Sequence, residues 1–142
     1  MMLDRVGIQR IVPQTGTMCL LDTVTRWDDR QILCIALPPG AAHPLARDGV
    51  VPAVAAVEYA AQATAIHGAL LSNATAPNAG LLAKLTDVSL LGESIPTDAG
   101  LLNVEATLLS ASAAGCLYTF EVTTALGPIA HGRLMVAFSR TA

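Results

Sequence analysis

Aromatic residues are scarce in this sequence of 142 residues: two Phe, two Tyr and one Trp make up 4% of it. A core with so few rings must be filled by small and medium aliphatic side chains. This favours close backbone approach, such as an Ala-rich helix lying against a sheet. Charged residues are also few, at 13%, whereas apolar residues reach 53%, so the composition excludes intrinsic disorder. The length corresponds to a single domain over residues 1–142.

Basic residues and long apolar runs are sparse as well. Eight Lys and Arg against eleven Asp and Glu give a net charge of −3, and no basic run suits nucleic acid. The longest weakly polar stretch, residues 52–71, contains Glu58, Gln62 and His67, which are costly in lipid. The chain opens without a basic segment followed by an apolar run. We therefore expect no nucleic-acid partner, no membrane span and no secretory signal.

The cysteines form no recognisable framework. Cys19, Cys34 and Cys116 are odd in number, far apart and accompanied by neither a CxxC pair nor a His-rich cluster. This pattern favours neither disulfides nor a metal site. We expect three reduced thiols in a cytoplasmic protein.

The segment 52–71 is the clearest helix in the sequence. Pro52 suits the first helical position, where its missing N–H costs nothing, and the segment is rich in Ala, the best helix former. Its apolar residues occur on nearly all sides, so we expect the helix to be buried on most sides.

Strand patterns lie on both sides of this helix. The segments 101–109 and 116–124 alternate apolar and polar residues, which indicates one buried face and one solvated face. We expect a loop with at most a short helical turn over 7–16, an irregular loop over 38–51, and a tight turn at Gly127-Pro128. The predicted strands are 19–27, 31–37, 81–91, 101–109, 116–124 and 129–138.

The order is thus two strands, one long buried helix and four strands. A single sheet must cover a helix that is apolar on nearly all sides, and a strongly curved antiparallel sheet wrapped around the helix satisfies this requirement. The sequence therefore predicts an α+β protein with the hot-dog fold.

Glu58 is the most informative polar residue, because Ala and Val surround it in the sequence. A carboxylate among apolar groups costs free energy unless it is paired or protonated. Burial favours the protonated form of a carboxyl group, as a general acid near neutral pH requires. The alternative is a partly exposed Glu at a helix end or an interface. Gln62 follows at i+4 and shares its face of the helix.

His43 lies nine residues before Pro52, in the loop rich in Pro and Gly. The N-terminus of a helix offers free N–H groups that stabilise a developing oxyanion. A His base, a carboxylic acid and such N–H groups together suit proton transfer beside a carbonyl. The alternative for His43 is a solvated loop residue. We expect His131 to be structural, and likewise His67, as a cation that complements the helix dipole near Gly68.

Two sequence stretches resemble a known enzyme family. The stretch V-P-A-V-A-A-V-E-Y-A-A-Q-A at 51–63 resembles the helix motif of the FabZ/FabA-type 3-hydroxyacyl-[acyl-carrier-protein] dehydratases, M-P-G-V-x-x-x-E-x-x-A-Q. The opening at 11–24 is similar to that family's L-P-H-R-x-P-x-L-L-x-D-R-V. The pattern at 43–68, H-P-L followed by E-Y-x-A-Q-A-x-A-x-H-G, is closer still to the predicted dehydratases of aryl-polyene-type acyl biosynthesis.

The resemblance implies a reaction and a site. His43 would be the base that removes the α-proton of a 3-hydroxyacyl thioester, and Glu58 the acid that protonates the departing hydroxyl to leave a trans-2-enoyl thioester. Gln62 would orient the acid. The thioester oxygen would bind N–H groups near Gly49 and at Ala53 and Val54.

The resemblance also implies partners. The substrate arm would belong to an acyl carrier protein, with no metal or free cofactor. His and acid of one site would come from different subunits, either of a homodimer or of a hot-dog heterodimer.

The sequence departs from the family motif in the loop before the helix. The family's H-F-P-G is His43-Pro44-Leu45-Ala46 here, so a glycine is missing and Gly49 is its candidate replacement. The motif's P-G is Pro52-Ala53. Two alternatives therefore stay open: a non-catalytic or weakly active subunit of a dehydratase heterodimer, and an acyl thioesterase in which Glu58 activates water.

Overall fold

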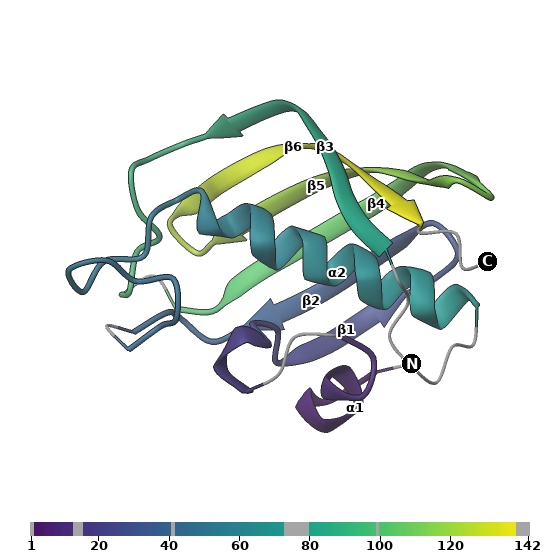
Figure 1. The fold of residues 1–142 in the computed structure, drawn as a ribbon. Coiled ribbons are helices and arrows are strands. Elements are labelled where there is room, and N and C mark those ends of the chain that lie inside the picture. The colour runs from purple at the N-terminus through teal and green to yellow at the C-terminus, as the bar shows by residue number, and fades with distance from the viewer. Residues whose placement is uncertain (1, 13–15, 41, 73–79, 99, 139–142) are drawn as a thin grey trace.

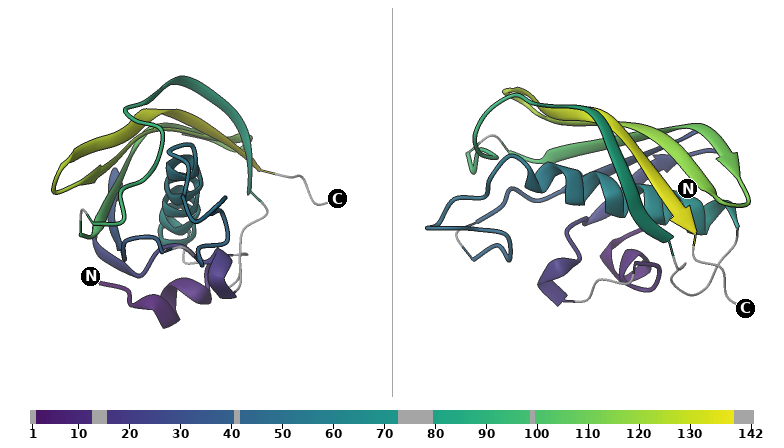
Figure 2. Two further views of the ribbon diagram at one scale, coloured as in Figure 1. Left: turned by 90° about the vertical axis from the view of Figure 1, so that its left-hand side faces the viewer. Right: turned by 45° about the horizontal axis from the view of Figure 1, so that its top comes forward.

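The computed structural model describes residues 2–12, 16–40, 42–72, 80–98 and 100–138. Its centre is one long helix, α2, and a six-stranded antiparallel sheet curls around it (Figure 1; Figure 2, left). The sheet order is β1-β2-β4-β5-β6-β3. This is the predicted hot-dog architecture. The elements are α1 (Arg5–Gln9), η1 (Gly16–Met18), β1 (Thr23–Trp27), β2 (Gln31–Ala36), α2 (Ala55–Leu71), β3 (Gly80–Leu90), β4 (Leu102–Ser112), β5 (Gly115–Thr124) and β6 (Gly127–Phe138).

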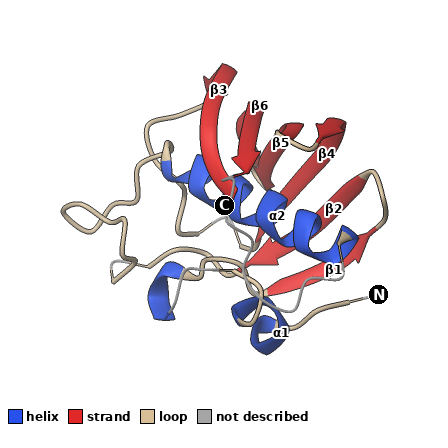
Figure 3. Cartoon of the chain, turned by 45° about the vertical axis from the view of Figure 1, so that its right-hand side comes forward, coloured by secondary structure: helices blue, strands red, loops and turns tan. Residues whose placement is uncertain are grey.

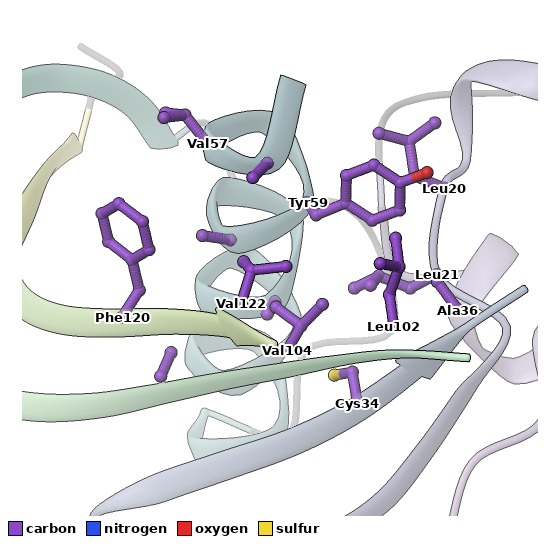
Figure 4. Packing of buried hydrophobic residues seen from close by; sticks show 14 of the residues in the cluster. Leu20, Leu21, Cys34, Ala36, Val57, Tyr59, Leu102, Val104, Phe120 and Val122 are labelled. Carbon is purple, nitrogen blue, oxygen red and sulfur yellow. The ribbon is translucent and has the colours of Figure 1, made fainter. Parts of the chain in front are cut away.

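Small side chains allow α2 to lie close to the sheet. Ala56, Ala60 and Ala63 of α2 are fully buried, and the helix packs mainly on β2, β4 and β5. The inward residues of β4 and β5 include Val104 and Val122, which face the helix in Figure 4. Both the predicted burial of the helix and the predicted alternation along β4 are confirmed. The shortage of aromatic rings and the abundance of Ala are therefore both explained by the close packing of α2 against the sheet.

The helix begins later than the sequence predicts. Residues 51–53 pair with residues 93–95, since the Ala53 N–H donates to the Glu93 carbonyl at 2.9 Å and the Ile95 N–H to the Val51 carbonyl at 2.9 Å. This pairing holds Pro52 outside the helix, and α2 starts at Ala55. The prediction of Pro52 as the first helical residue was wrong, because a tertiary hydrogen bond competed with local helix geometry.

Three other predicted boundaries also change. β1 starts at Thr23 rather than at 19, because the Leu20 N–H donates to the Gln62 side chain and not to a strand. Gly127 and Pro128 belong to β6 and pair with β5 rather than forming the turn. The predicted loop over 7–16 overlaps α1, which begins at Arg5 after the Asp4 cap, while positions 13–15 lie outside the described residues.

β3 bends sharply along its length while it pairs with β6 (Figure 2). The register shifts between Thr86 and Ser89, and Asp87 has a positive φ of 53°. A Cβ at Gly132 of β6 would lie 2.9 Å from the Cα of Val88, so only glycine fits opposite this bulge. The bulge turns β3 toward α2 and helps to close the sheet over the helix.

The three cysteines are free thiols, with Cys19 and Cys34 buried and Cys116 half-buried. Burial raises the pKa of Cys34 to about 12, so this thiol stays protonated and unreactive. Among the described residues, no helix has the length and apolarity needed to cross a membrane, and no group of His, Cys, Asp and Glu could hold a metal ion.

Candidate active site

The loop between β2 and α2 extends past the N-terminal end of the helix (Figures 1 and 3). Two hollows flank this end of α2. The His43 hollow is lined by Arg5, Thr17, Cys19, Leu20, Asp22, Leu37, Pro38, Pro39, Gly40, His43 and Tyr59. The Glu58 hollow is lined by Leu45, Arg47, Pro52, Val54, Ala55, Val57 and Glu58. The two share no lining residue, so within one chain the predicted base and acid open onto different spaces.

His43 is held by two hydrogen bonds. Its Nδ1 accepts from the Leu45 N–H at 3.1 Å, and its Nε2 lies 2.9 Å from the Tyr59 hydroxyl oxygen. The two rings stack with centroids 5.9 Å apart. Partial burial lowers the pKa of His43, so the neutral imidazole is favoured. Sequence reasoning missed Tyr59, because only the folded loop brings it to a residue sixteen positions away.

Tyr59 itself is buried on α2, and in Figure 4 its hydroxyl reaches away from the helix toward Leu20. Burial and the nearby Asp22 carboxylate raise the pKa of Tyr59 to about 12. The phenol therefore keeps its proton and offers His43 a neutral oxygen. Asp22, within the predicted strand 19–27, accepts from Arg5 at 3.1 Å and from the Leu37 N–H at 2.7 Å.

Glu58 is half-buried in the first turn of α2, and Gln62 lies one turn further along and is fully buried. The Gln62 amide nitrogen donates to the Glu58 carboxylate at 3.1 Å and to the Met18 carbonyl at 2.8 Å. The Gln62 oxygen accepts from the Leu20 N–H at 2.9 Å. The i+4 contact is formed as predicted, and the backbone of residues 18–20 fixes the orientation of the amide.

The N–H groups expected to hold a thioester oxygen differ in their surroundings and in their hydrogen bonds. The Ala53 N–H donates to the Glu93 carbonyl at 2.9 Å. Val54 is exposed and lines the Glu58 hollow, and none of the hydrogen bonds among the described residues uses its N–H. Of the expected donors, Val54 is the one placed beside Glu58.

Gly49 occupies the tip of a tight turn. Asp48 and Gly49 both have positive φ angles, 53° and 78°, and Arg47 and Val50 exchange backbone hydrogen bonds of 2.7 and 3.0 Å around them. This is the geometry of a type I′ turn, for which the dipeptide Asp-Gly is a strong sequence signal that the prediction of an irregular loop overlooked. Gly49 is exposed and lies outside the lining of the Glu58 hollow.

The other two histidines lie away from both hollows. His67 is fully buried, with Nε2 2.7 Å from the Asp28 carbonyl and Nδ1 2.7 Å from the Tyr118 hydroxyl. Burial lowers the pKa of His67, so its interpretation as a cation at the helix end was wrong, and α2 continues past Gly68. His131 is exposed on β6, where it pairs with Glu121 of β5.

Comparison with known proteins now identifies the family. The family model described as ApeP-like, ApeP dehydratase, matches residues 6–141. The chain belongs to the ApeP-like dehydratase family. This confirms the resemblance found in the motif at 43–68. No curated protein matches the chain.

Solved structures support the same fold. The dehydratase heterocomplex ApeI:P from Xenorhabdus doucetiae matches with a TM-score of 0.79 and 21% identity, covering 95% of this chain and 92% of that chain. AziG from S. sahachiroi matches at 0.62 and 12%, covering 83% and 90%. A thioesterase from Staphylococcus aureus matches at 0.64 and 12%, covering 82% and 92%. At these identities the ApeP-like chain shares the hot-dog fold with all three.

Proposed function

We propose that this ApeP-like chain eliminates water from a 3-hydroxyacyl group carried as a thioester on an acyl carrier protein, and so forms a trans-2-enoyl thioester. Membership of a dehydratase family supports the reaction type. The observation that carries the proposal is the hydrogen bond from the buried Gln62 amide to the half-buried Glu58 carboxyl group at the start of an apolar helix. The carrier protein, and with it a cytoplasmic location, follows from the motif resemblance.

The pair that performs the elimination is His43 and Glu58. In the assignment that the resemblance implies, His43 removes the α-proton, Glu58 protonates the departing hydroxyl, and the N–H of Val54 or Gly49 holds the thioester oxygen. Because the His43 and Glu58 hollows are separate in one chain, a complete site needs a second chain facing each of them. In this assignment the second chain is a second copy of the same chain, whose Glu58 meets His43. The similarity to a dehydratase heterocomplex supports instead the second candidate below, in which the second chain is a different hot-dog chain.

The test is incubation of the purified protein with a 3-hydroxyacyl carrier protein, followed by mass spectrometry of the acyl arm. We expect loss of the mass of one water, strongly reduced in Glu58→Gln and His43→Ala and unchanged in Glu105→Gln, a matched control on the exposed face of β4. Full activity of Glu58→Gln would refute the site. Release of a free thiol without enoyl product would replace the dehydratase by a thioesterase.

A second candidate is a weakly active subunit that works only with a different hot-dog chain. Two observations favour it: the Ala53 N–H is already hydrogen-bonded to Glu93, and His43 is hydrogen-bonded to Tyr59 within its own chain. In that case the protein alone would leave the 3-hydroxyacyl group unchanged, and the addition of a partner dehydratase chain would start the elimination. Activity of the protein alone at the level of the mixture would exclude this candidate.

A further inference from the structure

We propose that Arg5 is a positioning residue for the dehydration, because it fixes the backbone segment 16–22 that holds Gln62 in place. Gln62 in turn bonds to Glu58. The inference rests on the proposed function and leaves its assignment of base and acid unchanged. Its basis is a chain of hydrogen bonds that runs from the short helix α1 to the start of α2.

The segment 16–22 runs past α2 without belonging to a strand. A short 3₁₀ turn ends at Met18, and β1 starts only at Thr23. Residues 19–21 between them are buried. Buried backbone groups need hydrogen-bond partners, which residues outside a sheet ladder must find elsewhere. Here the side chains of Arg5 and Gln62 supply one for each of the residues 18–21.

Gln62 binds this segment from α2. Its amide nitrogen donates to the Met18 carbonyl at 2.8 Å, and its amide oxygen accepts from the Leu20 N–H at 2.9 Å. The same nitrogen donates to the Glu58 carboxyl group at 3.1 Å. Gln62 is fully buried, so the position of its amide depends on where these two backbone groups lie. A shift of the segment would therefore move the hydrogen bond to Glu58.

Arg5 binds the residues that alternate with those held by Gln62. Its Nη2 donates to the Cys19 carbonyl at 2.8 Å and to the Gly16 carbonyl at 3.3 Å, and its Nη1 donates to the Leu21 carbonyl at 3.3 Å. One guanidinium group reaches three carbonyls because its donors form a rigid planar fork. The segment is thus held by two side chains from two different helices.

Arg5 is itself held in place. It begins α1, which lies beside β1 (Figure 1) and is capped by Asp4, whose carboxylate accepts from the Gly7 N–H at 2.9 Å. Its Nη1 also forms an ion pair with Asp22 at 3.1 Å. The other Asp22 oxygen accepts from the N–H of Leu37, which directly follows β2, at 2.7 Å. The guanidinium is therefore a fixed point between α1 and the sheet.

Direct binding of the substrate is the alternative role for Arg5, because its side chain borders the His43 hollow. Each of its two Nη atoms carries two N–H groups, and each already makes two hydrogen bonds, with three backbone carbonyls and Asp22 as the acceptors. A substrate that took one of these N–H groups would have to break a bond to the segment or to Asp22. The geometry therefore favours positioning over substrate binding.

The first test measures kcat and KM of dehydration for Arg5→Met, with a partner chain where the activity requires one. We expect kcat to fall about tenfold and KM to change less than about twofold, because a displaced carboxyl group slows the chemical step without removing a substrate contact. Arg10→Met, exposed at the end of α1, is the matched control and should be unaffected. An unchanged kcat would overturn the proposal, and with a raised KM it would make Arg5 a substrate-binding residue.

Arg5→Lys carries the same test if Arg5→Met does not fold. Lys keeps the charge but not the fork of donors, so we expect kcat to fall about threefold with KM again unchanged. A kcat equal to that of the unmodified protein would show that the charge alone is needed, and would overturn the positioning by directed hydrogen bonds.

A double-mutant cycle tests whether Arg5 acts through Gln62. In Gln62→Met the amide that links the segment to Glu58 is gone, so the addition of Arg5→Met should lower kcat by less than a further factor of about two. A merely structural role of Arg5 would give the same loss in both backgrounds. Equal losses would therefore overturn the proposal.

A further measurement does not depend on turnover. The NMR signals of the Gln62 side-chain NH₂ group should shift in Arg5→Met and stay unchanged in Arg10→Met. Unchanged Gln62 signals in Arg5→Met would overturn the proposal even if the protein were active. Absence of dehydration by the unmodified protein, alone and with a partner chain, would instead count against the proposed function, which separates the two failures.

Discussion

Two histidines of this chain each bind a tyrosine, one near the start of α2 and one near its end. His67 is fully buried, and its Nε2–H ends on a backbone carbonyl while Nδ1 accepts from Tyr118. The other pair, His43 and Tyr59, lies at the edge of a hollow, and here the tyrosine accepts the hydrogen bond. Both imidazoles carry the proton on Nε2, yet their donors end on different kinds of group.

The two histidine–tyrosine pairs differ in what surrounds them. The carbonyl that accepts from His67 belongs to Asp28 in the turn between β1 and β2, so this bond ties the end of α2 to the sheet. The hydroxyl paired with His43 lies at the edge of the His43 hollow, where water can take its place. The same residue pair is therefore part of the core at one end of the helix and borders a hollow at the other.

The largest expected difference is in the stability of the two histidine variants. His67→Ala empties a fully buried position and leaves the Tyr118 hydroxyl without its partner in the core, so we expect a loss of about 3 kcal/mol in the free energy of unfolding. His43→Ala, at a half-buried position that water can reach, should cost less than about 1 kcal/mol. Denaturant unfolding of both variants measures the contrast, and equal losses would break the comparison.

The tyrosines should differ in the same direction. Tyr118→Phe removes the donor to a buried Nδ1, and we expect a loss of about 1.5 kcal/mol. Tyr59→Phe removes only an acceptor that water can replace beside the hollow, so about 0.5 kcal/mol is expected. Thermal unfolding of the two variants is the measurement. A larger loss for Tyr59→Phe would mean that the His43 pair is structural as well.

Acidification should act through the buried histidine. Because the pKa of His67 is lowered on folding from the usual 6.5, the unfolded chain binds more protons below that pH. Stability is therefore complete above pH 6.5 and falls as the pH decreases through the folded pKa, by up to about 1.4 kcal/mol per pH unit for this proton. The pKa of His43 is also lowered by burial, so this residue contributes to the loss of stability at low pH in the same direction.

The measurement is urea unfolding between pH 7 and pH 5. The free energy of unfolding should change less with pH in His67→Gln than in the unmodified protein. His131→Gln is the control for the loss of an exposed imidazole. An unchanged slope in His67→Gln would show that this histidine is not the sensitive group.

The smallest change in stability is expected on the outer face of the sheet. His131 there is exposed and pairs with Glu121, which in turn lies directly opposite Glu105. Like charges in directly opposed positions destabilise a sheet, so Glu121→Gln should raise stability by about 0.3 kcal/mol. A loss of stability, measured by thermal unfolding, would show that Glu121 is attracted to its neighbours on the adjacent strands.

Much of the fold could be predicted because it depends on local patterns. The alternation along 101–109 and the apolar, Ala-rich segment around Glu58 each have one regular solution, and the contact from Glu58 to Gln62 follows from helical spacing alone. The start of α2 could not be predicted, because the N–H of the distant Ile95 binds the Val51 carbonyl that the first turn of a helix starting at Pro52 would use. The turn at Asp48-Gly49 was predictable from its dipeptide and was overlooked.

The sequence by itself determined the hot-dog order, the dehydratase motif and the two residues, His43 and Glu58, on which the proposed chemistry rests. Only the tertiary structure decided that these residues open onto separate hollows, that Tyr59 accepts from His43, and that Leu45 and Gln62 set the direction of the hydrogen bonds. The physical reason is distance along the chain. Periodicity reports neighbours within a few residues, whereas the position of a proton depends on every donor and acceptor that folding brings within about 3 Å.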